Sequence, residues 1–165
     1  MKKYIKDLVP YIVIIVVVVL IRTFIATPVI VVGDSMVPTL KEGQWLLLNK
    51  IGYQFKEIER YDIVVIKMEK SEIIKRVIGL PGETIEYRNN ILYIDGHEKN
   101  SEFNFDTDDF TLKSICNCDK IPDDKYLVLG DNRQVSSDSR IIGLIDKKDI
   151  KGKTSISLWP IKKVK

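Results

Sequence analysis

Residues 73–78 read Ile-Ile-Lys-Arg-Val-Ile, a run of β-branched side chains interrupted by two cations. Such a run favours a β-strand, in which alternate side chains point to opposite faces. Lys75 therefore shares a face with Ile73 and Val77. It is either an edge residue that reaches water or an amine held in an apolar site. Burial lowers the pKa of a lysine, and the neutral amine that results can act as a general base.

Short runs of the same kind recur on both sides of this strand, separated by turn residues. Asn89-Asn90 and Asp95-Gly96 are dipeptides that favour tight hairpin turns. The spacing predicts an all-β domain, and no segment after residue 30 shows sustained helical periodicity. Residues 95–124 are polar and acidic, so we expect them to lie outside the core. The predicted strands are 29–32, 45–49, 63–67, 73–78, 84–88, 91–95, 126–129, 141–145 and 153–158.

The N-terminal segment has the composition of a membrane-spanning helix. The 19 residues 8–26 carry a single charge, Arg22, and would form a helix of about 28 Å, close to the roughly 30 Å of a hydrocarbon core. Lysines at positions 2, 3 and 6 predict that the N-terminus is cytoplasmic. We therefore expect a cytoplasmic tail over 1–7, a transmembrane anchor over 8–26 and an extracytoplasmic domain over 27–165.

A cleaved secretory signal is the competing interpretation of this segment, since it also combines basic residues with a short apolar run. A cleavage site requires small residues at two positions, and Ala26 is the only alanine in the chain. A core helix of a soluble protein is disfavoured because the run has no polar face. An uncleaved anchor is the interpretation we prefer.

Composition excludes several classes of protein and site. Hydrophobic residues make up 45% and charged residues 30%, which is typical of a globular protein. The 26 basic and 23 acidic residues are too evenly balanced to predict a nucleic-acid partner. One histidine and two cysteines are too few for a His-based triad or a multi-ligand zinc site, so we expect no metal and no cofactor.

The histidine and the cysteines are assigned no catalytic role. His97 follows the Asp95-Gly96 turn and is expected to be a solvated turn residue. Cys116 and Cys118 are two residues apart, which closes too small a loop for an easy disulfide. Free thiols and a strained redox pair both remain open.

A second reactive stretch, Gly33-Asp34-Ser35-Met36-Val37-Pro38, follows a predicted strand. Glycine and proline so close together predict a sharp turn. A serine at such a turn can present its hydroxyl as a nucleophile and its backbone N–H to a developing oxyanion. A serine that only caps the turn is the alternative.

Four motifs in order, together with the apolar N-terminal segment, resemble the bacterial type I signal peptidases, and in particular their compact Gram-positive-like members. The motifs are Ser-Met-x-Pro-Thr from Ser35, Tyr-Asp-Ile-Val-Val from Tyr61, Lys-Arg-x-x-Gly-x-Pro-Gly from Lys75 and Gly-Asp-Asn-Arg-x-x-Ser-x-Asp-Ser-Arg from Gly130. The resemblance implies a mainly β fold, in which a transmembrane helix precedes an antiparallel β-sheet catalytic domain. It also implies a membrane-anchored serine endopeptidase that removes signal peptides from exported preproteins after small residues at −3 and −1.

The same resemblance implies a role for individual residues. Ser35 matches the nucleophile and Lys75 the general base. The supporting residues that it implies are Ser136, whose hydroxyl orients the amine, Gly33, the structural ion pair Asp138 and Arg140, and Asp131 and Arg133, which hold the same turn. Pockets for small substrate side chains would be lined by Val31, Val32, Met36, Leu40, Ile73 and Ile74. The implied partners are signal-peptide-bearing preproteins and the lipid bilayer; the oligomeric state stays open.

The chain departs from the family pattern near these motifs. Gly33 stands where some members carry a serine that completes the oxyanion hole, so the second donor would be a backbone N–H or a water. Tyr61 replaces a common glycine and Val135 a common asparagine, while Glu83 replaces a usual aspartate.

Two other functions were weighed against a signal peptidase. A self-cleaving Ser/Lys regulator like the SOS repressors is disfavoured because the chain has no Ala-Gly cleavage site. A non-catalytic membrane-anchored β-module is disfavoured because both Ser35 and Lys75 are present.

Overall fold

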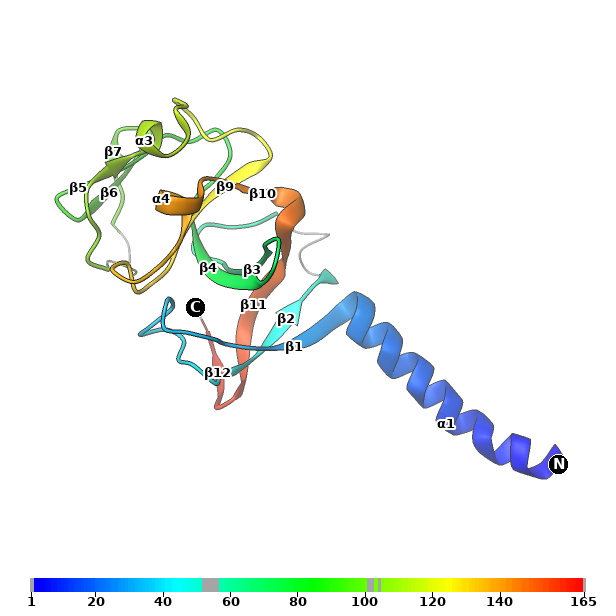
Figure 1. Cartoon of the computed structure of the whole chain (residues 1–165). Helices are drawn as coiled ribbons and strands as arrows, with labels where there is room; N and C mark the ends of the chain where they lie inside the picture. The colour runs from blue at the N-terminus through cyan, green and yellow to red at the C-terminus, as the bar shows by residue number, and fades with distance from the viewer. Residues whose placement is uncertain (1, 52–56, 101–102, 104, 165) are drawn as a thin grey trace.

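A computed structural model describes residues 2–51, 57–100, 103 and 105–164. Helix α1 (Lys2–Leu20) continues into a π-helical segment, η1 (Ile21–Ile25), which leads directly into strand β1 (Ala26–Ile30). Figure 1 shows α1 projecting away from the rest of the molecule. The window Leu8–Ile25 has a mean hydropathy of 2.8 and is not buried against protein. The helix is therefore a candidate membrane span, and its helical part ends one residue before the predicted boundary.

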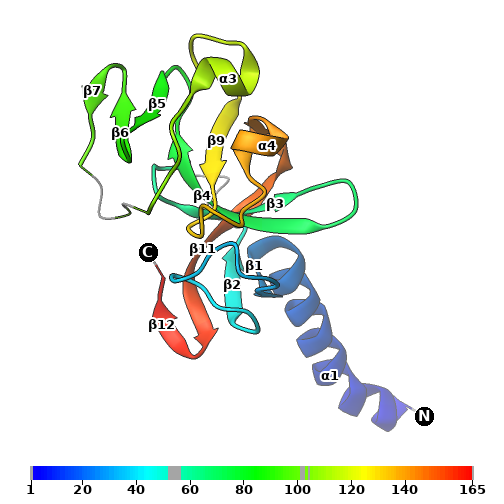
Figure 2. The same cartoon turned by 60° about the vertical axis from the view of Figure 1, so that its left-hand side comes forward.

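The rest of the described chain is mainly antiparallel β-structure in two sheets, one of eight strands and one of four. The larger sheet contains, in spatial order, β1, β2 (Trp45–Asn49), β11 (Ile150–Trp159), β3 (Ile63–Lys67), β4 (Glu72–Gly79), β9 (Lys125–Leu129) and β10 (Ile145–Asp146), with β12 (Ile161–Lys163) paired to β11. The smaller sheet contains β7 (His97–Glu98), β6 (Ile91–Ile94), β5 (Ile85–Arg88) and β8 (Phe110–Thr111). The connections include α3 (Leu112–Cys116), α4 (Ser139–Ile142) and η2 (Lys147–Asp149). The smaller sheet and α1 lie at opposite ends of the molecule (Figures 1 and 2).

Several sequence predictions are confirmed at the level of single elements. The bounds of β2 and β3 are those predicted, and β5 and β6 are joined by Asn89-Asn90. Both asparagines have positive φ, 50° and 64°, as a type I′ hairpin turn requires. Asp95 and Gly96 follow the same pattern, with φ of 51° and 79°.

The strand predicted over 141–145 is wrong. The structure has the short helix α4 there, followed only by the two-residue β10. The Asp138 side chain accepts a hydrogen bond from the Arg140 N–H and so caps the helix, and Gly143 ends it with φ 82°. These local capping bonds outweigh the β-propensity of Ile141 and Ile142.

Residues 95–124 were expected outside the core, and this prediction is also wrong in part. Leu112 and Ile121 are buried in the core of the smaller sheet, together with Ile78 and Ile85. Apolar residues in this acidic segment, among them Leu112 and Ile121, thus attach it to the smaller sheet. His97, expected in a turn, lies exposed in β7.

Cys116 and Cys118 form a disulfide, so of the two states that the sequence left open, free thiols and a redox pair, the structure has the pair. Asn117, between them, is left-handed at the C-terminus of α3, with φ 51° and ψ 34°. This turn leaves the two Cα atoms 5.2 Å apart, inside the range that disulfides span.

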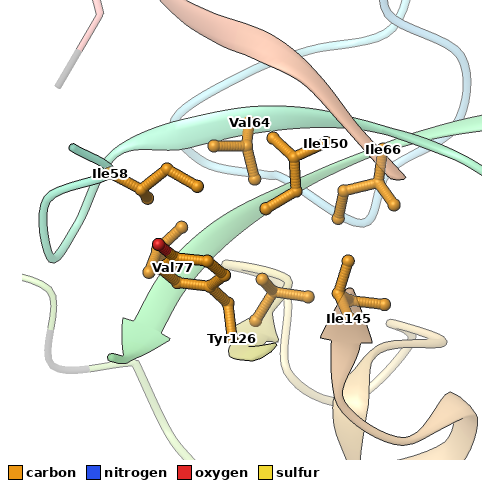
Figure 3. Packing of buried hydrophobic residues seen from close by; sticks show 8 residues of the cluster. Ile58, Val64, Ile66, Val77, Tyr126, Ile145 and Ile150 are labelled. Carbon is orange, nitrogen blue, oxygen red and sulfur yellow. The ribbon is translucent and has the colours of Figure 1, made fainter. Parts of the chain in front are cut away.

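Strand β4 is covered on both faces, and this positions the site. Figure 3 shows the core that covers one face, where Val77 of β4 lies beside Tyr126 in a cluster that also contains Val64 and Ile66 of β3. Ile78, the next residue, points into the core of the smaller sheet. Because alternate residues of β4 face two different cores, both cations in the middle of the strand are buried.

Candidate active site

Ser35 lies in a tight turn that follows β1. Gly33 has φ 80°, a left-handed conformation that glycine adopts without a steric penalty and that reverses the chain before the serine. The Val37 N–H donates to the Asp34 carbonyl at 3.1 Å and closes the turn. The Asn132 N–H donates to the Ser35 carbonyl at 3.0 Å, which fixes the serine to the loop after β9.

Lys75 of β4 reaches this serine, and the Lys75 Nζ lies 2.8 Å from the Ser35 Oγ. The lysine is only 3% exposed. Burial lowers its pKa because the ammonium form loses its hydration, while the carboxylates of Asp138 and Asp131 raise it by a smaller amount. A neutral amine in contact with a hydroxyl can take its proton, so this pair has the geometry of a nucleophile and its general base.

Arg76, to which sequence reasoning gave no role, joins the motifs to one another. Its guanidinium donates to both carboxylate oxygens of Asp131, at 2.8 and 2.7 Å. It also donates to the Tyr61 carbonyl at 3.0 Å and to the Thr39 hydroxyl at 3.4 Å, and the ring of Phe103 covers it at 3.9 Å. Its place in an apolar strand, on the same face as Ile74 and Ile78, was the available signal that this cation needs a buried partner.

The loop after β9 is braced by a second ion pair. Asp138 and Arg140, expected to pair, lie 2.9 Å apart between Oδ1 and Nε and 3.0 Å apart between Oδ2 and Nη2. Asp138 also accepts the Gly130 N–H at 2.9 Å. Arg133 donates from Nε to the Gly130 carbonyl at 2.9 Å. Asp131 forms its ion pair with Arg76 of β4, outside this loop. The loop that holds Ser35 in place is therefore itself held by charged side chains.

Ser136 is brought to the site, but not to a hydrogen bond with the lysine. Its side chain is 4% exposed, and within the described residues its Oγ has no hydrogen-bond partner. It packs against Gly130, since a Cβ placed on Gly130 would lie 2.1 Å from the Ser136 Oγ and 2.6 Å from the Ser35 carbonyl oxygen. Its hydroxyl is therefore buried beside the nucleophile turn.

Gly33 was expected to support catalysis, and it supplies the turn described above. Its N–H donates to the Glu42 Oε1 over a long 3.5 Å. The positive φ at this position would strain any residue with a side chain. A serine like that of some relatives would have to adopt this left-handed conformation.

A narrow cleft of about 120 Å³ runs along β1 and β4 to the dyad. Five of the six predicted pocket residues line it: Val31, Val32, Met36, Ile73 and Ile74. Leu40 does not, because the turn directs it into the core with Leu46, where it is completely buried. No cluster of three or more His, Cys, Asp or Glu side chains suited to a metal occurs in the described residues.

Comparisons with known proteins show which sequences and which solved structure this chain is similar to. A family model for signal peptidase, peptidase S26, matches residues 2–159. The chain is 41% identical over 157 residues to signal peptidase IB of Staphylococcus aureus, covering 86% of this chain and 82% of that protein. It is 38% identical over 164 residues to signal peptidase I of Bacillus caldolyticus, covering 93% and 90%. A crystal structure of signal peptidase I from Enterococcus faecalis matches with a TM-score of 0.55 and 35% identity, covering 59% of this chain and 97% of that one.

Proposed function

This chain belongs to the signal peptidase family, peptidase S26, and we propose that it removes signal peptides through a Ser35 nucleophile and a Lys75 general base. Family membership makes it a serine endopeptidase. The observation that carries the proposed mechanism is the 2.8 Å contact between the Ser35 Oγ and the amine of a buried lysine. A lysine that stayed charged could not accept the serine proton, and burial is what disfavours its charge.

Acylation begins when the Ser35 Oγ attacks the carbonyl carbon of the scissile bond and its proton passes to the Lys75 amine. The substrate carbonyl oxygen becomes an oxyanion, which the Ser35 N–H stabilises. As the C–N bond breaks, the Lys75 ammonium gives the proton to the leaving nitrogen, and an ester remains on Ser35. In deacylation Lys75 takes a proton from water, the hydroxide attacks the ester, and the proton returns to the Ser35 Oγ.

The narrow cleft supports a preference for small substrate residues at −3 and −1. β1 lies at the edge of the larger sheet, where an extended peptide can add as a further strand and be held by main-chain hydrogen bonds. The cleft walls beside β1, such as Val31 and Ile74, are apolar and leave only about 120 Å³. Excluding one methylene is worth about 1–3 kcal/mol, so a small volume favours alanine over longer side chains.

The N-terminal helix supports membrane anchoring with the catalytic domain outside the cytoplasm. Ser35 follows Ile25 by only ten residues, so it lies within about 35 Å of the end of the apolar helix. Trp45 and Trp159 are paired across β2 and β11, and both are exposed, as suits aromatic residues at a membrane interface. An anchored site of this kind meets a signal peptide close to the membrane surface.

Cleavage of a preprotein by the full chain in membranes tests the dyad. Ser35→Ala and Lys75→Ala are each expected to lower kcat/KM by about a thousandfold or more, because the two groups act as one unit. Ser71→Ala and Lys120→Ala, on exposed side chains, are matched controls and should cleave normally. Cleavage by a folded Ser35→Ala or Lys75→Ala variant would disprove the dyad.

The topology is tested by protease digestion of cells from which the outer membrane or the wall has been removed while the cytoplasmic membrane is left intact. The domain after Ile25 should be digested from outside, while a tag placed before Lys2 should be protected. Protection of the domain instead would reverse the proposed orientation.

A further inference from the structure

A second pocket, of about 520 Å³, continues from the dyad toward the loop after β9. Both pockets are lined by Ser35 and Lys75, so the dyad stands where they meet. The narrow cleft can hold only the residues on one side of the scissile bond. If residues −3 to −1 of an extended substrate fill the narrow cleft, the residues that follow the scissile bond must lie in the second pocket. The wider pocket is therefore the place for the first residues of the mature protein.

Asp34 lines this second pocket and does not line the first. It directly precedes Ser35, so the Cα atoms of the two residues are about 3.8 Å apart. Its side chain is exposed, and its backbone carbonyl accepts the turn hydrogen bond from Val37. No hydrogen bond or ion pair engages the Asp34 carboxylate within the described part of the chain. An acidic side chain without a partner among the described residues thus faces the leaving-group side of the reaction.

The other groups around Asp34 do not neutralise it. Glu42 contacts the Gly33 amide on the same turn and adds a second carboxylate nearby. The lining residues Asn132 and Val135 carry no charge. Lys75 is the basic residue in the lining of this pocket, and its burial favours the uncharged amine over the ammonium form. The charged groups at this turn, Asp34 and Glu42, are therefore both acidic.

We propose that Asp34 is a specificity-determining residue, which favours a basic side chain and disfavours an acidic one at positions +1 and +2 of the substrate. This inference rests on the proposed function, because it needs cleavage at Ser35. Unlike charges a few ångströms apart at a protein surface attract by an amount that changes a rate several-fold. Since an extended chain advances about 3.3 Å per residue and salt screens charges over about 10 Å, the effect should vanish within a few residues.

The test measures kcat/KM for peptides that carry Lys, Ala or Glu at +1, at +2 or at +8 and are otherwise identical. For the unmodified chain at about 0.1 M salt, the Lys peptide should exceed the Glu peptide by about three- to tenfold at +1 or +2 and be equal to it at +8. Asp34→Asn should bring this ratio close to one, and Asp34→Lys should invert it. Asp123→Asn, on an exposed carboxylate at the other end of β9, is the matched control and should keep the ratio.

The Ala peptides separate the two proposals. If the Ala peptides are cleaved but the Lys and Glu peptides are cleaved equally well, this inference is overturned while the proposed function stands. The same holds if Asp34→Asn keeps the ratio, or if about 1 M salt leaves the ratio unchanged, since shape rather than charge would then select. If no peptide is cleaved, the proposed function fails and this inference fails with it.

Discussion

Arg76 and Asp131 form a bidentate ion pair in which both side chains are completely buried. Each of them is adjacent in sequence to a residue that either belongs to the Ser35–Lys75 pair or positions it. Arg76 follows Lys75 in β4, and Asp131 precedes Asn132, whose N–H donates to the Ser35 carbonyl at 3.0 Å. The ion pair therefore connects the two backbone segments that bring Ser35 and Lys75, the proposed nucleophile and base, together.

Asp131→Asn should destabilise the protein by about 3–5 kcal/mol, because it leaves the Arg76 guanidinium buried without its counter-charge. The measurement is urea unfolding of the chain in detergent micelles. Asp146→Asn is the control, since its pair with Lys125 is partly exposed and should contribute much less to stability. Equal losses in the two variants would contradict the importance of the buried pair.

The double variant Arg76→Met, Asp131→Leu removes both charges and should recover much of the lost stability. It should still cleave poorly, because the contacts of Arg76 with Thr39 and with the Tyr61 carbonyl are lost. Stability without activity would mark the pair as a positioning device. Full activity in the double variant would show that packing alone aligns the dyad.

The rate of cleavage should rise with pH as Lys75 loses its proton. Burial lowers the pKa of this amine, so the rise should lie at lower pH than the ordinary lysine value of 10.5. A profile of kcat/KM against pH, with a peptide that has no titrating group in the range, measures it. A rise that follows the ordinary lysine value would mean that the reacting amine is solvated.

Stability should depend on pH through the same group. Between the lowered folded pKa and the ordinary value of 10.5, the unfolded chain binds a proton that folded Lys75 does not, so stability rises with pH in that interval. Lys75→Met removes the titrating group, and its advantage in unfolding free energy over the unmodified chain should be largest at low pH and shrink toward 10.5. An advantage that is constant with pH would contradict a buried, titrating lysine.

Ser136→Ala should leave stability almost unchanged, because the buried hydroxyl has no partner among the described residues and losing it breaks no bond. If that hydroxyl orients Lys75 during the reaction, kcat should fall about 10- to 100-fold, with a displaced pH profile. Ser139→Ala is the control: its Oγ accepts the buried Val128 N–H at 2.9 Å, so it should cost about 1–3 kcal/mol and leave the pH profile in place. The opposite pattern would make Ser136 a structural residue.

Several of the strands could be predicted from sequence, and Ser35 and Lys75 could be singled out as candidates, because both depend on local pattern. β2 and β3 follow from β-branched and apolar runs between turn residues, and Ser35 and Lys75 stand in motifs with fixed spacing. The contact between their side chains could not be predicted from local pattern, since forty residues separate them in the chain. The sequence identifies a candidate nucleophile and a candidate base. The packing of β4 against the turn that carries Ser35 brings their side chains into contact.

The features that sequence reasoning missed depend on distant or competing contacts. Arg76 finds its carboxylate 55 residues away, which no periodicity indicates. Leu40 was placed in the cleft by the family resemblance, but the turn directs its side chain into the core. The helix α4 replaced a predicted strand because the Asp138 cap is stronger than the β-propensity of the residues after it.

Gly130→Ala should damage both stability and catalysis, because this position lies between the nucleophile and its support. A Cβ there would approach the Ser136 Oγ to 2.1 Å and the Ser35 carbonyl oxygen to 2.6 Å, so one of them must move. Overpacking of this kind costs about 1–3 kcal/mol. Gly79→Ala is the matched comparison, since its Cβ would meet Ile121 at 2.5 Å in the core of the smaller sheet, away from the dyad.

Both glycine variants should therefore unfold at lower urea concentration, but only Gly130→Ala should lose cleavage under conditions in which each variant is fully folded. The measurement pairs unfolding curves with kcat at a temperature well below both transitions. If Gly79→Ala loses activity to the same extent, the smaller sheet and the dyad are coupled more tightly than their separate cores imply. If Gly130→Ala remains fully active, the Ser35 carbonyl can shift away from Gly130 without disturbing its hydroxyl, and the contact with Asn132 is not needed to hold the nucleophile.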